Sequence, residues 1–196
     1  MNCLEPIIFK SNLPVPCRKC AGCMKRRVLE WGNRMVLESH GQGYKPLFIT
    51  LTYAPEYEPG EHSEALHMTQ LFYKSLRNDG FQFRYFNALE RGTTGTKRLH
   101  NHMILWSKDL YRMYFKTRSA YIRHRWGRGR VDVQDLRTKA GLIYTAKYVT
   151  KDFAPKNGRQ YQFSNRPQLG TPGIERWGEL ILSTGVDYTR ENPPPN

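Results

Sequence analysis

Several kinds of segment are absent from this sequence of 196 residues. No run approaches the roughly 18 consecutive apolar residues of a membrane-spanning helix. The first residues include Asn2, Glu5 and Lys10, so they lack the apolar core of a secretory signal peptide. The sequence contains no glycine-rich phosphate-binding loop of a helicase and no internal repeat. These absences predict a cytoplasmic protein with one main domain, no membrane partner and no small-molecule cofactor beyond a metal ion.

Acidic side chains are few: 17 Asp and Glu face 31 Lys and Arg, which gives a formal net charge of +14 and favours acidic partners. The basic side chains gather at 25–27, 97–98 and 123–130, as expected of a surface that binds nucleic acid. The third group also holds an aromatic ring for base stacking, although a solvated basic loop would have the same composition. The predicted DNA-binding residues are Arg123, Arg125, Trp126, Arg128, Arg130, Lys97 and Arg98.

Only four cysteines occur, namely Cys3, Cys17, Cys20 and Cys23. In a reducing compartment they predict free thiols or metal ligands instead of disulfides. The last three form a Cys-x-x-Cys-x-x-Cys run, and with Cys3 they offer four thiolates for a tetrahedral structural Zn²⁺ site. Closely spaced thiols are also typical of iron–sulfur ligation. Four thiols without a metal are the remaining alternative.

The apolar pattern predicts an α+β protein. Residues recurring at helical spacing predict helices over 24–39, 68–76, 110–125 and 138–152. Runs rich in β-branched and aromatic residues predict strands over 47–53, 81–90, 99–107 and 129–136. Residues 1–22 and those after 155 are expected to be loop-rich. The order indicates a mostly antiparallel sheet flanked by helices, as in ferredoxin and RNA-recognition folds. We predict a Cys-rich N-terminal segment over 1–23, a main domain over 24–190 and a disordered tail over 191–196.

A histidine pair lies within the third predicted strand. Side chains alternate across a strand, so His100 and His102 point from the same face. Glu90 ends the neighbouring strand and offers a third ligand. Nitrogen and oxygen donors with open positions suit Mg²⁺ or Mn²⁺ bound together with a substrate phosphate. Two surface histidines on the edge of a sheet are the alternative interpretation.

Two tyrosines occupy one face of the last predicted helix. Tyr144 and Tyr148 are four residues apart, so their hydroxyls point in the same direction, about 6 Å apart along the axis. Each tyrosine is followed three residues later by a lysine, Lys147 or Lys151, which can offset phosphate charge. A tyrosine hydroxyl can attack a phosphodiester and hold one DNA end covalently. An ordinary aromatic stripe that packs against the sheet would have the same spacing.

These motifs follow one another in an order that resembles the HUH endonuclease superfamily. The apolar strand Phe48-Ile49-Thr50-Leu51-Thr52-Tyr53 is followed by Glu90, by His100-Asn101-His102 and by two overlapping Tyr-x-x-Lys units. More narrowly, the chain is similar to the replication initiators of small single-stranded DNA phages, the microviruses. The likeness rests also on the Pro-Cys-x-x-Cys-x-x-Cys opening and on Asn165-Arg166-Pro167, and covers roughly residues 14 to 172.

The resemblance implies a five-stranded sheet whose metal-bearing face is covered by the tyrosine helix. It implies that His100, His102 and Glu90 bind Mg²⁺ or Mn²⁺, and that Tyr144 and Tyr148 are the nucleophiles. The implied substrate is single-stranded DNA at a replication origin. Attack would leave a 5′-phosphotyrosine link and a 3′-hydroxyl for a host polymerase, with a host helicase as a further partner.

One position departs from the pattern of the superfamily. The residue between the two histidines is usually bulky and apolar, but here it is Asn101. Its side chain should point to the opposite face of the sheet, where it needs a hydrogen-bond partner or solvent. Two other functions remain open: a related transposase or relaxase that makes the same nick, and a zinc-dependent DNA-binding regulator without catalysis.

Overall fold

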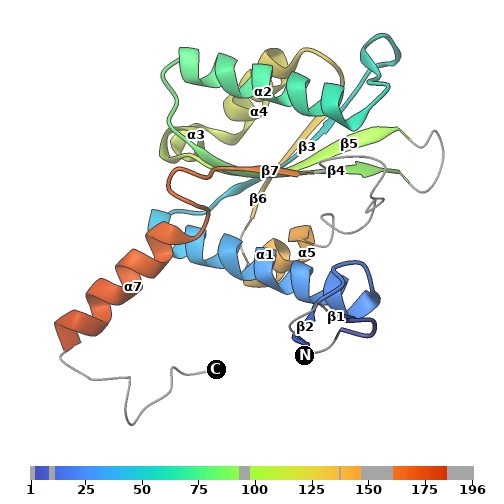
Figure 1. The fold of residues 1–196 in the computed structure, drawn as a ribbon. Helices are drawn as coiled ribbons and strands as arrows, with labels where there is room; N and C mark the ends of the chain where they lie inside the picture. The colour runs from blue at the N-terminus through green and yellow to red at the C-terminus, as the bar shows by residue number, and fades with distance from the viewer. Residues whose placement is uncertain (1–2, 9–11, 93–97, 137, 147–160, 185–196) are drawn as a thin grey trace.

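The computed structural model describes residues 3–8, 12–92, 98–136, 138–146 and 161–184. A five-stranded sheet forms its centre, and helices cover both faces of this sheet (Figure 1). The strands lie in the spatial order β6-β3-β5-β4-β7, and each neighbouring pair is antiparallel. The predicted α+β class and antiparallel sheet are therefore confirmed. The five strands are β3 (Leu47–Thr52), β4 (Arg84–Arg91), β5 (Leu99–Trp106), β6 (Val131–Asp135) and β7 (Tyr161–Phe163).

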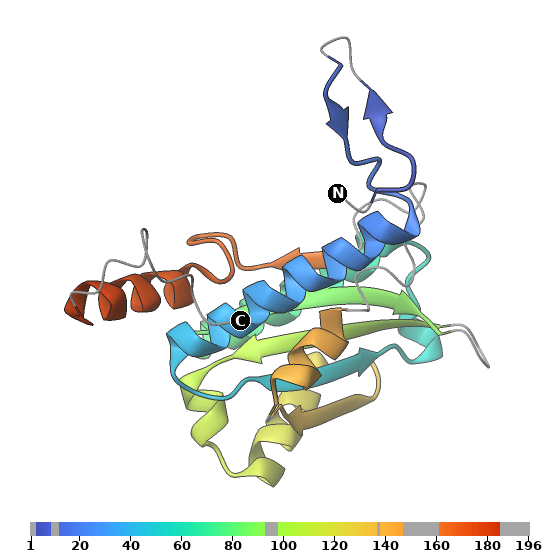
Figure 2. The ribbon, with the colours of Figure 1, turned by 90° about the horizontal axis from the view of Figure 1, so that it is seen from below.

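The alternation of side chains along the strands divides the core into two layers. Leu47, Ile49 and Leu51 point to one face of β3 and pack beneath α2 (His62–Asn78) and α4 (Phe115–Trp126). Phe48 points to the other face, where α1 (Ala21–Gln42) and α5 (Lys139–Ala146) lie (Figure 1, Figure 2). Each face of the sheet thus has its own hydrophobic cluster.

The predicted helices differ from the observed ones at several ends. α2 begins at His62, six residues before the predicted start, because His62, Ala65 and Leu66 already pack on the sheet. The helix predicted over 110–125 is instead two: α3 (Lys108–Arg112) ends where the extended backbone of Met113 and Tyr114 separates it from α4. The Ser107 hydroxyl caps α3 by accepting a hydrogen bond from the Leu110 N–H.

Both ends of the described chain hold structure where loops were expected. Near the N-terminus, β1 (Ile7–Ile8) and β2 (Pro14–Val15) form a small hairpin that projects from the body (Figure 2). Between β3 and α2, η1 (Pro55–Tyr57) is a short 3₁₀ turn. α1 begins at Ala21, so Cys23 lies in its first turn. Beyond residue 160, β7 and α7 (Thr171–Thr184) replace the expected loops. The predicted tail over 191–196 lies outside the described residues.

α7 crosses α1 at a contact between backbones. A Cβ atom added to Gly173 would lie 2.0 Å from the Leu37 carbonyl oxygen, and one added to Gly41 would lie 2.4 Å from the carbonyl carbon of Pro172. Glycine at these two positions therefore allows the helices to approach so closely. Among the described residues, no helix combines the length and the apolar composition required to cross a membrane.

Candidate active site

The histidine pair lies on the face of the sheet that α1 and α5 cover. In the β4–β5 ladder, Glu90 stands opposite His100 and Ala88 opposite His102. On the other side of β5, Thr52 stands opposite His100 and Thr50 opposite His102. All these side chains share one face because partners in an antiparallel ladder point the same way.

The side chains around His102 are in direct contact. Its Nε2 atom lies 2.9 Å from Oε2 of Glu90, diagonally across the two strands. Its Nδ1 atom lies 3.5 Å from the Thr50 hydroxyl, and its ring stacks parallel to Phe48 at 5.9 Å between ring centres. The His100 and His102 ring centres are 6.3 Å apart. The strand alternation that placed the histidines could also have revealed Thr50, which was not among the predicted site residues.

The donor types at this site fit a divalent metal ion. Two imidazoles and one carboxylate share a face, and Glu90 already reaches His102. Among the described residues, the four cysteines are the group of possible ligands that already lie together around one point. If Glu90, His100 and His102 held one ion, it would take the place of the Glu90–His102 contact.

Asn101 points to the opposite face, where it is fully buried, as predicted. Its Oδ1 atom accepts hydrogen bonds of 3.0 Å from the Thr69 hydroxyl and from the Asn87 amide. Its own amide donates to the Tyr53 hydroxyl at 2.6 Å. The amide is satisfied within a polar network behind the histidine pair, so the departure from an apolar residue is compatible with the fold.

α5, the helix that holds Tyr144, packs on the histidine face of the sheet. Leu142 and Ala146 are buried against that face, and Ile143 packs closely on Gly32 of α1. The Tyr144 side chain is 54% exposed. The described part of the predicted helix ends at Ala146, so Tyr148, Lys147 and Lys151 lie outside the described residues. One of the two predicted nucleophiles is thereby located on a helix that covers the face of the sheet on which the histidines lie.

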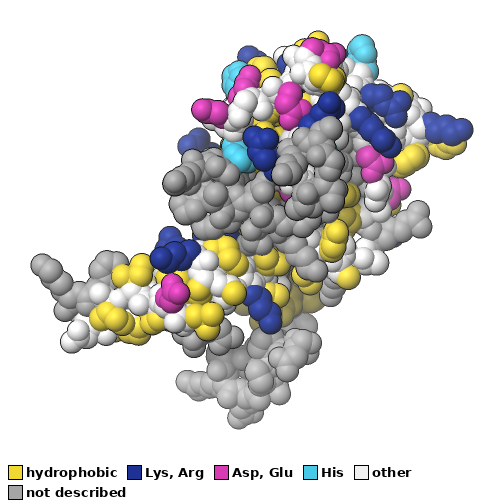
Figure 3. Space-filling model, turned by 90° about the vertical axis from the view of Figure 1, so that its right-hand side faces the viewer, with side chains coloured by type: hydrophobic (Ala, Val, Ile, Leu, Met, Phe, Trp, Pro, Cys, Tyr) yellow, Lys and Arg dark blue, Asp and Glu magenta, His cyan; other side chains and the backbone are white. Residues whose placement is uncertain are grey.

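The basic segment after α4 adjoins the same end of the sheet. The Thr52 N–H donates to the Arg130 carbonyl at 2.9 Å, and the Arg130 N–H donates to the Thr52 hydroxyl at 3.1 Å. Since Thr52 pairs with His100, Arg130 lies beside the candidate metal site. Arg130 and Arg123 are exposed. Figure 3 shows further Lys and Arg side chains in several groups on the side of the molecule where the β4–β5 turn lies.

Other predicted DNA contacts are engaged within the protein. Trp126 is completely buried and donates its indole N–H to the Thr52 carbonyl, so the stacking role predicted for it is wrong. Its ring fills the core between β3 and α2. The residues around it in the sequence are mostly basic, so the apolar pattern gave no sign of this burial. Arg125 pairs with Asp79 at 2.6 Å, and Arg98 with Glu58 at 3.8 Å. Arg128 donates to the Trp126 carbonyl, and Lys97 lies outside the described residues.

The four cysteines form one cluster, as predicted. Their sulfur atoms all lie within 4.8 Å of one another, and the Cys17–Cys23 and Cys3–Cys20 sulfurs are each 3.9 Å apart. Backbone N–H groups point at the sulfurs: Leu4 donates to Cys20, and Cys17 donates to Cys3. Sulfurs arranged in this way can hold a metal ion.

The surroundings of these thiols shift the pKa of Cys20 and the pKa of Cys23 in opposite directions. The N–H groups of Leu4 and Cys23 lower the pKa of Cys20 to about 6. Burial raises the pKa of Cys23 to about 12, and the neighbouring sulfurs add to this effect. Like charges so close together disfavour one another, so four thiolates in this space call for a cation between them.

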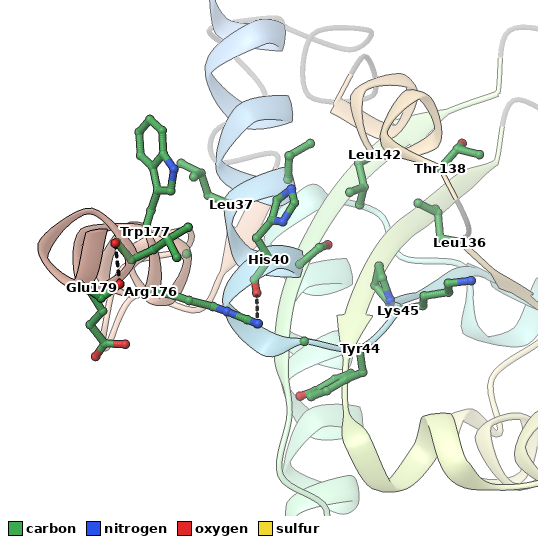
Figure 4. Close-up of a pocket in the computed structure, with 17 residues that line it drawn as sticks. Leu37, His40, Tyr44, Lys45, Leu136, Thr138, Leu142, Arg176, Trp177 and Glu179 are labelled. Carbon is green, nitrogen blue, oxygen red and sulfur yellow. Dashed lines mark hydrogen bonds between the residues drawn. The ribbon is translucent and has the colours of Figure 1, made fainter. Parts of the chain in front are cut away.

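A large apolar cavity of about 1030 Å³ lies away from the histidines (Figure 4). Leu37 of α1, Leu142 of α5 and Trp177 of α7 are among its lining residues. Tyr44 precedes β3 and Leu136 follows β6, so the cavity is at the opposite end of the sheet from His100. This cavity is therefore separate from the candidate metal site.

Comparison with known proteins adds a family to this geometry. The family model of the replication-associated protein ORF2 matches residues 46–153, which include the histidine pair, Glu90 and both tyrosines. The replication-associated protein ORF2 of Spiroplasma virus 4 is 31% identical over 92% of this chain and 58% of its own length. The replication-associated protein ORF4 of Chlamydia phage 1 is 29% identical over 72% of this chain and 39% of its own length.

The matches cover different shares of this chain and of its relatives. The chain spans about three fifths and two fifths of the lengths of these two relatives. No solved structure matches the chain. The family match covers more than half of the chain and begins just before β3. The chain therefore belongs to the family of the replication-associated protein ORF2.

Proposed function

We propose that this chain initiates phage DNA replication by nicking single-stranded DNA at an origin with a tyrosine nucleophile. The observation that carries this proposal is the shared face of the sheet: His100, His102 and Glu90 lie on the face over which α5 carries Tyr144. A histidine pair with a carboxylate, and a tyrosine on the helix that covers the same face, suit phosphodiester cleavage with a covalent intermediate. Family membership supports a role in replication.

His100, His102 and Glu90 would hold Mg²⁺ or Mn²⁺, which when bound supplies positive charge that polarises the scissile phosphate. The Tyr144 or Tyr148 hydroxyl attacks the phosphorus and loses its proton to solvent. The bond from phosphorus to the 3′ oxygen breaks, and that oxygen takes up a proton. One product is a 5′-phosphotyrosine, and the other is a free 3′-hydroxyl. Lys147 and Lys151 would offset phosphate charge during the attack.

The 3′-hydroxyl is the natural primer for a host DNA polymerase, with a host helicase opening the duplex ahead of it. In the bacterial cytoplasm, one circuit of synthesis regenerates the origin, and the second tyrosine cuts it again. The newly freed 3′-hydroxyl then attacks the first phosphotyrosine, which rejoins the DNA and releases the tyrosine. Two tyrosines in one helix suit this sequence of steps, because one is occupied when the second cut is due.

The cysteine cluster would hold a structural Zn²⁺ ion. Four sulfurs within 4.8 Å of one another match the tetrahedral four-thiolate site that zinc prefers. Cys3 precedes the β1–β2 hairpin and the other three cysteines follow it, so a metal here would tie the base of this hairpin to the start of α1. This role is separate from DNA cleavage.

The nicking function is tested by covalent capture. The chain is incubated with a labelled single strand that carries the phage origin, with Mn²⁺ added, and separated on a denaturing gel. A labelled band at the mass of the protein is expected, and the Tyr144→Phe, Tyr148→Phe double variant should form none. Phenylalanine keeps the ring but removes the attacking oxygen. If the wild-type chain binds the strand but forms no adduct with Mn²⁺ present, it acts as a DNA-binding regulator and the nicking proposal is wrong.

A further inference from the structure

A groove lies between the Cys-rich segment, α1 and β7. Its volume is about 390 Å³. Four arginines line it, against a single acidic side chain, Glu30. Three aromatic residues line it as well. These basic and aromatic residues are Arg18, Arg26, Arg27, Arg34, Trp31, Tyr161 and Phe163.

The arginines come from two separate elements. Arg27 and Arg34 are seven residues apart on α1, so they lie on the same side of this helix, two turns apart. The Arg34 guanidinium lies 5.9 Å from the centre of the Trp31 ring, and it donates to the Leu169 carbonyl at 3.4 Å. Arg26 forms an ion pair with Glu30 at 2.8 Å. The positive charge of Arg26 is therefore offset, and that of Arg34 is held over an aromatic ring.

The cysteine cluster holds the fourth arginine at the rim. Arg18 lies between Cys17 and Cys20 and has a φ of 62°, a left-handed conformation that is unfavourable for residues with a side chain. The backbone of Arg18 faces the Cys23 sulfur and partly offsets the rise in the pKa of that thiol. Arg18 thus belongs to the segment that carries the cysteines and lines the groove from there.

Aromatic rings form one side of the groove. Trp31 packs against Phe163 at 4.6 Å and against Tyr161 at 5.2 Å, measured between ring centres. Tyr161 and Phe163 are both partly exposed, and Trp31 beneath them is buried. Arginines beside aromatic rings are the combination that binds single strands, since the cations contact phosphates and the rings stack on unpaired bases.

The groove is close to the candidate active site. Tyr161 of β7 stands opposite Ala88 of β4, and Ala88 stands opposite His102 of β5. Two strand spacings, about 10 Å, therefore separate Tyr161 from His102. Both side chains point to the α1 face of the sheet. A strand with one phosphate at His102 would reach the groove within a few nucleotides.

We propose that this groove is a second binding site for single-stranded DNA. Arg18, Arg27 and Arg34 contact the phosphates, and an unpaired base stacks on Tyr161 or Phe163. The inference extends the proposed nicking function, because it assigns the flanking strand a position beside the cut. Duplex DNA would bind more weakly, because its bases are already stacked on one another.

The test measures affinity in the absence of cleavage. Binding of a labelled twelve-nucleotide thymidine strand is followed by fluorescence anisotropy at several salt concentrations, in the Tyr144→Phe, Tyr148→Phe background. Arg27→Gln with Arg34→Gln should weaken binding about tenfold and reduce the slope of log Kd against log salt by about 1.4, since each phosphate contact on a single strand contributes about 0.7. Arg112→Gln with Lys116→Gln removes the same charge from α3 and α4 and should change neither quantity.

A second measurement addresses the aromatic side of the groove. A DNA strand that contains 5-iododeoxyuridine is bound to the Tyr144→Phe, Tyr148→Phe chain with all its arginines intact and is then irradiated. It should crosslink to the peptide that holds Tyr161 and Phe163. Equal losses of affinity in the groove variant and in the control variant, or crosslinks confined to other peptides, would overturn the proposed binding site. Nicking activity does not enter either measurement. A chain that nicks but shows no groove dependence refutes only this inference, and a chain that binds through the groove but never nicks refutes only the proposed function.

Discussion

The Asn101 amide donates a hydrogen bond of 2.6 Å to the Tyr53 hydroxyl, directly behind the strand that carries the histidine pair. Asn101 also accepts from Thr69 of α2 and from Asn87 of β4, so one side chain joins three elements to β5. Burial raises the pKa of Tyr53 to about 12, which keeps this phenol neutral as a partner. The network holds β5 in register from the face opposite the metal site.

Replacing Asn101 with leucine should lower the free energy of unfolding by about 2–4 kcal/mol, because the buried Asn87 amide would lose its acceptor. Urea unfolding measures the change. Adding Asn87→Leu removes the unpaired amide and should restore part of the loss. A change below about 0.5 kcal/mol in the single variant would mean that the network contributes little to stability.

His102→Ala should abolish covalent adduct formation with little change in affinity for single-stranded DNA. The imidazole would be lost as a ligand, whereas affinity depends mainly on phosphate contacts elsewhere. Glu90→Gln keeps the shape of the side chain with a weaker oxygen ligand, so excess Mn²⁺ should restore part of its activity. Gel assays of adduct and anisotropy of the same strand separate the two effects. Full nicking in excess chelator contradicts a metal site at this histidine pair.

Tyr144→Phe and Tyr148→Phe should each retain some adduct formation, because either hydroxyl on one helical face can reach the same phosphate. Release of closed circles should fall in both single variants, since the second cut needs a tyrosine that is not already joined to DNA. Adduct is quantified on a short strand and circle release on a template with two origins. Loss of all adduct in one variant, with wild-type behaviour of the other, would identify a one-tyrosine enzyme.

The cysteine cluster should contain one zinc ion per chain by elemental analysis. Cys17→Ser should lose this ion, and His100→Ala with His102→Ala should keep it, because the two sites share no ligand. Loss of zinc should increase hydrogen exchange in the β1–β2 hairpin, since metal binding supplies folding energy to such segments. A metal-free preparation with the same melting temperature and the same protection of the hairpin would rule out a structural zinc.

Gly173→Ala should destabilise the chain by about 1–3 kcal/mol, because its new methyl group would meet the Leu37 carbonyl at 2.0 Å and push α7 away from α1. Gly178→Ala in the same helix is the matched control: its Cβ would have no atom within 4 Å, and alanine should stabilise a helix by up to about 1 kcal/mol. Thermal unfolding of both variants compares them. Equal effects would mean that α7 does not depend on this close crossing.

Local patterns in the sequence determined four strands of the sheet and the shared face of His100 and His102. Alternation along a strand and helical spacing are properties of neighbouring residues, so they can be read without the fold. The position of Glu90 beside the histidines followed from the same hairpin, because Arg91 and Leu99 pair at its turn. The order of the motifs was likewise sufficient to predict the family.

Other features were decided by contacts between distant segments. β7 has three residues, too few for a periodic signal, and it forms because β4 offers a free edge to pair with. Trp126 ends a basic helix, yet it is buried because β3 and α2 leave a space that its ring fills. The groove of arginines and aromatic rings exists because Arg18 and Tyr161, which are far apart in the sequence, line the same hollow. Strand pairing, side-chain burial and contacts between distant segments depend on the whole chain. For that reason only the tertiary structure revealed them.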